Sequence, residues 1–307
     1  MIIPQDFTEV ATKVASVLPT PRTSHTALPT VIPDLPRIYH QTSSEVGHST
    51  LWVVCVLMGL SSLAFYAMAM RVPVQKRLFH IITALVTTFA FLSYYAMATG
   101  DGITSHPYVS GRSKHGAVTE ITERDVYWAR YVDWTLTTPL LLLDLCLFAG
   151  IDGASILVAV VSDVIMILTG LFAALSGNET QGWGWYAFAC IAYINIVYQV
   201  GFKGRQAIST RDNKTRAFFG SISLYMFLLW TAYPIVWGVA DGAHRVNVDS
   251  EIIAYAILDV LAKGFFGFWL LLTHDSMTRA SPSIDGFWSH GLTPDGAIRV
   301  GEGNDRD

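Results

Sequence analysis

The sequence is poor in charged residues for its length. Of its 307 residues only 14% are charged while 52% are hydrophobic, and the net charge at pH 7 is −4. A soluble domain usually carries about 25% charged residues, so this chain lacks the polar surface of a water-soluble globule of its size. The small negative charge gives no sign of nucleic-acid binding. The composition indicates a polytopic membrane protein.

Cysteine is also scarce, and familiar catalytic motifs are missing. The three cysteines, Cys55, Cys146 and Cys190, all fall in apolar runs. An odd number in such places indicates buried free thiols rather than a disulfide framework or a metal site. We find no phosphate-binding glycine loop, no zinc-ligand spacing and no nucleophile motif, and we expect no metal.

Long apolar runs dominate what is present. Each is about 20 residues, the length that crosses roughly 30 Å of hydrocarbon as a helix. Helices satisfy every backbone amide inside a bilayer. The sequence therefore predicts an all-α membrane protein, a bundle of seven transmembrane helices, near residues 51–70, 78–99, 127–148, 154–175, 183–202, 217–240 and 252–273.

Lysine and arginine gather in the first and fifth connections between the runs, at 71–77 and 203–216. Basic connections usually face the cytoplasm, so we expect the N-terminus outside and the C-terminus inside. Connection 100–126 is long and is expected to form a short extracellular hairpin. The predicted divisions are a flexible extracellular tail at 1–47, a seven-helix domain at 48–275 and a cytoplasmic tail at 276–307.

Several ionisable residues lie inside the apolar runs, where a charge at the bilayer centre costs about 2.5–3.5 kcal/mol. A single aspartate in such a place is about as often a structural hydrogen-bond partner as it is a functional group. A set this large is harder to explain by structural pairing, because cheaper groups would suffice. The set comprises Arg130, Asp133, Asp144, Asp163, Asp259 and Lys263.

Asp133 and Asp144 are separated by 11 residues, about three helical turns, so they share one face roughly 16 Å apart. The residues between them are mostly apolar, which resembles two stations of a proton path with a dry gap. Lys263 is the candidate bridge, because a buried lysine can form a Schiff base with a carbonyl compound. Asp259, one turn away, and Asp133 would then act as counter-ions.

Three segments carry a resemblance to a known family: ARYVDWTLTTPLLLLDL at 129–145, WTAYPIVW at 230–237 and LDVLAKG at 258–264. They resemble the microbial rhodopsins, and closely the proton-pumping fungal branch. The resemblance implies a light-driven outward proton pump, an ion transporter rather than an enzyme. It implies a multi-pass protein in lipid, in the plasma membrane of a fungal cell, and leaves open a homo-oligomer, either a dimer or a trimer.

The resemblance assigns roles to the buried charges. Lys263 matches the lysine that binds all-trans retinal as a protonated Schiff base. Asp133 matches the primary counter-ion and proton acceptor, and Asp259 the second counter-ion. Asp144 matches the cytoplasmic proton donor. Arg130 matches the arginine that swings between the counter-ions and the exit.

Further matches concern proton exit and support of these groups. Glu251 matches one member of the proton-release group. Asp241 lies near the place of its partner but out of register, which puts early proton release in question. Tyr94 and Tyr233 match tyrosines that hydrogen-bond the second counter-ion. Thr137 matches a threonine that supports the acceptor.

The retinal pocket is implied by the same resemblance. Thr83 matches the threonine that holds the donor. Asp163 is expected at the ring end of the pocket, protonated because burial without a cation favours the neutral form. In the fifth span the alignment slides, and Trp185 is preferred over Trp183. The other expected wall residues are Trp134, Thr138, Leu141, Met166, Gly170, Trp230, Tyr233, Pro234 and Trp237.

Other functions remain as alternatives. A chloride pump needs a neutral residue at 133, and a sodium pump of this family carries an Asn/Asp/Gln triplet where this chain has Asp133, Thr137 and Asp144. A photosensory rhodopsin usually lacks the donor carboxylate, although some fungal members with complete pump residues also serve signalling. A hormone-type seven-helix receptor has no use for this set of charges.

Overall fold

A computed structural model of the chain describes residues 35–74, 77–114, 116 and 118–276. Most of the expected N-terminal tail, residues 1–34, and the expected C-terminal tail from 277 onward lie outside the described residues. The chain divides into two units at Pro36, and everything below concerns the unit that begins at Arg37.

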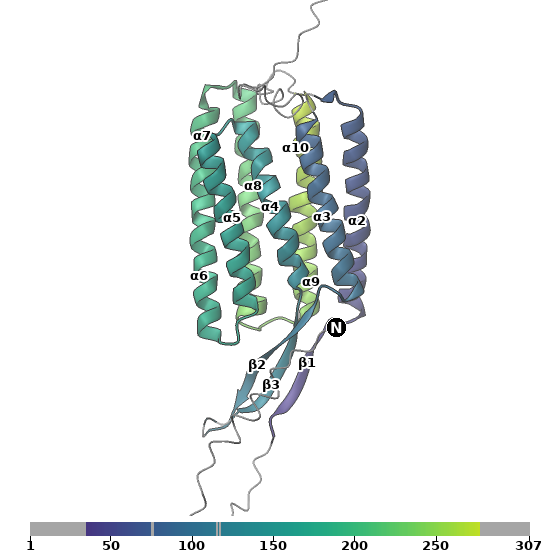
Figure 1. The fold of residues 1–307 in the computed structure, drawn as a ribbon, viewed down its shortest axis with the longest axis vertical. Helices are drawn as coiled ribbons and strands as arrows, with labels where there is room; N and C mark the ends of the chain where they lie inside the picture. The colour runs from purple at the N-terminus through teal and green to yellow at the C-terminus, as the bar shows by residue number, and fades with distance from the viewer. Residues whose placement is uncertain (1–34, 75–76, 115, 117, 277–307) are drawn as a thin grey trace, which may run out of the picture. The chain divides into compact units, whose positions relative to one another are not determined.

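Seven helices in the described part of the chain are long and apolar enough to cross a membrane, as predicted. Each overlaps one of the expected runs, although the fifth span ends at Thr210, eight residues after its predicted end at 202. Together they form a bundle (Figure 1). They are α2 (Glu45–Met70), α3 (Leu78–Thr99), α4 (Trp128–Ala149), α5 (Gly153–Ala174), α6 (Glu179–Ile196) continued by η2 (Val197–Lys203), α7 (Gly204–Ala207) and η3 (Ile208–Thr210), α8 (Asn213–Trp237) continued by η4 (Gly238–Gly242), and α9 (Val248–Asp259) continued by η5 (Val260–Phe265) and α10 (Phe266–Ser276).

The helix ends follow local capping rules. Asp152 accepts a hydrogen bond from the backbone N–H of Ser155, and Asn247 accepts one from Ser250, each satisfying a free donor of the first turn. Helices α3 and α4 end at Gly100 (φ 89°) and Gly150 (φ 74°). Glycine adopts this left-handed conformation without the steric cost that a Cβ would bring.

A three-stranded sheet adds to the predicted all-helical architecture. Strands β2 (Thr104–Arg112) and β3 (Val118–Val126) form an antiparallel hairpin, which confirms the hairpin expected in connection 100–126. Its extracellular side stays a prediction. Strand β1 (Arg37–Gln41) pairs in parallel with β3. Figure 1 shows the sheet beyond the ends of α4 and α9.

The expected boundary of the N-terminal tail at residue 47 is wrong on its C-terminal side. Residues 37–41 form strand β1 and α2 already begins at Glu45, where Ser44 caps the helix by accepting from the N–H of Val46. Pairing with β3 supplies the hydrogen bonds that a polar segment of this kind would otherwise make to water. The proline content of the segment gave no indication of this pairing.

Polar and charged side chains lie inside the bundle while large apolar ones lie outside. Leu63 is 67% exposed and Ile194 is 66% exposed, whereas Asp144 and Asp259 are 0% exposed. This pattern suits a surrounding of lipid, in which buried charges face the bundle interior. The site is therefore in the middle of the bundle.

Candidate functional site

Lys263 is at the centre of the site, buried within the π-helical segment η5. Its Nζ donates to the Oδ2 of Asp133 on α4 and lies 3.1 Å from the Oδ1 of Asp259. A π-helical turn inside an α-helix is rare and occurs often at functional sites. Nothing in the sequence LDVLAKG predicted it. The structure thus brings together the lysine and both predicted counter-ion carboxylates.

The two carboxylates are held differently. Asp259 accepts hydrogen bonds from Tyr94 (2.7 Å), Tyr233 (2.8 Å) and the indole N–H of Trp134 (3.2 Å). Among the described residues, the Oδ1 of Asp133 has no hydrogen-bond partner. Asp259 is therefore fixed by neutral donors, while Asp133 has an oxygen available to accept a proton.

The tyrosine partners of Asp259 agree with the sequence prediction, and the indole of Trp134 is an addition to it. Thr137 lies one turn from Asp133, as expected, but its hydroxyl donates 2.9 Å to the backbone carbonyl of Asp133 rather than to the carboxylate. Thr137 supports the helix backbone at Asp133, not its carboxylate.

An apolar cavity adjoins Lys263. Its lining is almost entirely apolar, as is common in small-molecule sites. All eight residues expected as walls beside Tyr233 line it, together with Tyr233 itself. They are Trp134, Thr138, Leu141, Met166, Gly170, Trp230, Pro234 and Trp237.

The expectation for the fifth span is wrong. Trp185 is 39% exposed and packs against Phe172 and Phe188 on the outside of the bundle. Helix α6 presents Tyr186 to the cavity instead, one residue further along and about 100° around the helix. Trp183 makes an edge-to-face contact with Trp237 but does not line this cavity.

Two other predicted pocket residues do not line the cavity but hydrogen-bond to residues of the site. Asp163 is buried and accepts a 2.6 Å hydrogen bond from Thr138, which itself lines the cavity. Tyr94 reaches the site through Asp259. Wall residues that sequence reasoning missed are Tyr131, Ile167, Tyr186, Ala189, Cys190, Tyr193, Tyr255 and Ala262.

Asp144 lies on the same helix as Asp133, toward the opposite end of α4 from the sheet. It is 0% exposed and accepts a 3.3 Å hydrogen bond from Thr83 on α3, as predicted. Within the described residues no lysine or arginine forms an ion pair with it. A carboxyl group in such surroundings is favoured in its neutral form.

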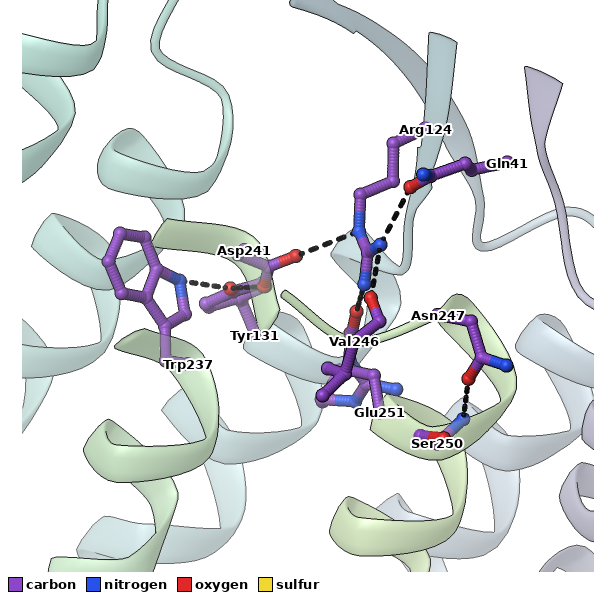
Figure 2. Close-up of polar contacts among 10 residues, drawn as sticks. Gln41, Arg124, Tyr131, Trp237, Asp241, Val246, Asn247, Ser250 and Glu251 are labelled. Atoms are coloured by element: carbon purple, nitrogen blue, oxygen red, sulfur yellow. Dashed lines mark hydrogen bonds and ion pairs between the residues drawn. The ribbon is translucent and has the colours of Figure 1, made fainter. Parts of the chain in front are cut away.

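Toward the sheet, the Nη1 of Arg130 donates a 2.7 Å hydrogen bond to the Oε1 of Glu251 on α9. Its guanidinium also lies 4.3 Å from the ring centroid of Tyr255. Sequence reasoning missed a second buried arginine, Arg124 on β3, which binds the other oxygen of Glu251 and lies 3.8 Å from Asp241 (Figure 2). In the sequence, Arg124 looked like any loop charge, because β1 and α9 bury it only in the folded chain.

The loop between α8 and α9 places His244 beside this cluster, in a left-handed conformation with φ 51°. Its ring stacks on Tyr108 of β2 at 3.8 Å between centroids. Burial lowers the pKa of His244 to about 4, and the positive charge of Arg124 acts in the same direction. His244 is therefore neutral at pH 7.

Comparisons with known proteins agree with this geometry. The sequence model described as Bacteriorhodopsin-like protein matches residues 46–277. Opsin-1 of Neurospora crassa is 49% identical over 285 residues, which are 90% of this chain and 91% of that protein.

Two solved structures share the fold. One is that of the light-driven proton pump LR (Mac) from Leptosphaeria maculans, 51% identical, with a TM-score of 0.76 over 80% of this chain and 100% of that one. The other is that of the light-driven proton pump rhodopsin CsR from Coccomyxa subellipsoidea, 37% identical, with a TM-score of 0.70 over 76% and 100%. With a buried lysine between two carboxylates at its centre, this seven-helix chain belongs to the bacteriorhodopsin-like family.

Proposed function

We propose that the protein is a light-driven outward proton pump whose cofactor is all-trans retinal, covalently bound to Lys263. The observation that carries the proposal is the asymmetric placement of Lys263, between a carboxylate with all its donors in place and one with an open oxygen. The Leptosphaeria and Coccomyxa structures, which share the fold, are described as light-driven proton pumps.

The residues present suit retinal. The amine of Lys263 lies at an apolar cavity whose walls include eight aromatic side chains, which matches an extended hydrocarbon chain with one reactive carbonyl end. Held on the nitrogen of Lys263, retinal would supply absorption of visible light and a change of shape that alters the surroundings of the proton on that nitrogen.

The proton path follows from how the carboxyl groups are held. Asp133 contacts the nitrogen of Lys263 and has a free oxygen, so it accepts the proton. Asp144, neutral among apolar side chains and hydrogen-bonded to Thr83, returns a proton to Lys263 from the other side. Transfer from one side and return from the other gives a net movement along the bundle.

The charges of the connections decide which end of the bundle faces outside, and with it the direction of transport. The end with Asp144 adjoins the basic connections and is assigned to the cytoplasm, and the sheet end is assigned to the outside. Moving one charge against 100 mV costs about 2.3 kcal/mol, a small part of the energy of a visible photon. The host membrane we propose is the plasma membrane of a fungal cell, in keeping with the Neurospora and Leptosphaeria relatives.

The residue at 133 favours protons as the transported ion. A fixed carboxylate in contact with Lys263 occupies the place that an anion would need and repels it. This chain also carries Asp133, Thr137 and Asp144 where the sodium pumps of this family carry the Asn/Asp/Gln triplet.

The test is illumination of cells that express the protein with added all-trans retinal in an unbuffered medium. We expect the medium to acidify in the light, and the signal to vanish with a protonophore and in Lys263→Ala. A pigment that forms normally but gives no acidification would contradict pumping and favour a photosensory role.

A further inference from the structure

Arg124 is buried although it comes from a strand at the edge of the bundle. It is 2% exposed, and its Nη1 donates to the side-chain oxygen of Gln41 on β1 (3.0 Å) and to the carbonyl of Val246 (2.9 Å). Its Nη2 donates to Glu251 at 2.7 Å (Figure 2). Four segments, β1, β3, the loop before α9 and α9, therefore converge on one guanidinium. Such a group is fixed in place more firmly than a surface arginine.

Glu251 is held between two arginines. Its Oε1 accepts from Arg130 and its Oε2 from Arg124, each at 2.7 Å. Glu251 itself is 1% exposed. A proton on either oxygen would displace a charge-assisted hydrogen bond in a place that water hardly reaches. Glu251 is therefore an ionised link between the two guanidinium groups.

Asp241 is near the same arginine but is bound more loosely. Its Oδ1 lies 3.8 Å from the Nε of Arg124, beyond hydrogen-bond distance, and Tyr131 is 3.5 Å from its Oδ2. Within the described residues, the Nε of Arg124 has no hydrogen-bond partner. No short charge-assisted contact thus opposes a proton on Asp241.

The buried acids outnumber the buried cations by one. Among the described residues from Lys263 to the sheet, the buried cations are Lys263, Arg130 and Arg124, and the buried acids are Asp133, Asp259, Glu251 and Asp241. Three of those acids each lie within 3.1 Å of a cationic nitrogen. The fourth, Asp241, does not. Because an unbalanced buried charge is costly, the surplus acid carries a proton.

Asp241 is also placed between the interior and the outer surface. Tyr131 lines the retinal cavity, accepts from the indole of Trp237 at 3.1 Å and contacts Asp241 (Figure 2). Asp241 also lines a second, more polar cavity together with His106, Tyr108 and His244. A proton on Asp241 is therefore next to a polar space on the sheet side of the bundle.

We infer that Arg124 is a positioning residue for proton exit, which keeps Glu251 ionised and leaves the releasable proton of the exit cluster on Asp241. The role in proton exit rests on the proposed pumping function. The location of the proton in the dark is a separate property that can be measured without transport.

The test is infrared spectroscopy of the dark protein at pH 7, with aspartate or glutamate carboxyl groups labelled with ¹³C. A protonated carboxyl group absorbs apart from a carboxylate, and the label shifts only its own residue type. Among the described residues, Glu251 alone of the glutamates is buried, so a glutamate-derived protonated band would report on it. We expect no such band in the unaltered protein, and an aspartate-derived component that disappears in Asp241→Asn.

Arg124→Gln removes one cation and should produce a glutamate-derived protonated band. Arg124→Lys keeps the charge and is the matched control, for which we expect no such band. A glutamate-derived band in the unaltered protein would overturn the inference, as would an aspartate signal unchanged in Asp241→Asn. The first of these outcomes needs no variant, so a variant that fails to fold does not remove the test. Failure of the cells to acidify their medium would refute pumping and leave this result standing.

Discussion

Replacing Asp144 by asparagine should slow the return of the proton to Lys263. Asp144 and Asp133 are 11 residues apart on α4, about 16 Å along the helix axis. Leu141, Leu142 and Leu145 around them are at most 2% exposed, so water has little access to this stretch. A positioned acid contributes roughly 10²–10⁴-fold to a proton transfer, and we expect a slowing of that order.

The assay is flash photolysis of the purified pigment, in which reprotonation is read from the recovery of the visible band. Azide, a small diffusible acid, should accelerate recovery in Asp144→Asn because it replaces the missing donor. Asp163→Asn is a matched control, since Asp163 is also 0% exposed and bonded to one threonine hydroxyl. An unchanged recovery in Asp144→Asn, or an equal slowing in Asp163→Asn, would refute the donor role.

Two further predictions concern stability. Asp259→Asn leaves Lys263 with one carboxylate partner and should lower the free energy of unfolding by about 3–5 kcal/mol, measured by thermal unfolding in detergent. An unchanged unfolding temperature would contradict it. For His244, whose folded pKa is about 4 against 6.5, the unfolded chain binds a proton first as the pH falls. Stability should therefore decline from pH 6.5 to 4 by about 1 kcal/mol, after a discount for partial exposure. His244→Asn should remove that decline, and an identical decline in the variant would exclude His244 as its source.

The helices were predictable because a bilayer restricts both their length and their composition. The sheet was only half predictable. The hairpin of β2 and β3 follows from a long polar connection between two spans. Strand β1 pairs with β3 across about 80 residues of sequence, and no local pattern in RIYHQ specifies such a partner.

Within the site, spacing along one helix was a reliable guide and orientation between helices was not. Lys263, Asp259 and Asp133 could be predicted because charges in apolar runs must find each other. The choice of Trp185 was wrong because α6 is aromatic on several sides, and its sequence does not show which side faces inward. Arg124 was missed because its burial depends on Gln41, Val246 and Glu251, which are far from it in sequence.

The most direct measurement is the position of the covalent link to the cofactor. The protein reconstituted with all-trans retinal should absorb visible light, and reduction with borohydride should make the link permanent. Mass spectrometry of the peptides should then find the retinyl mass on the peptide that contains Lys263. A visible pigment in which Lys263 is unmodified would contradict the account.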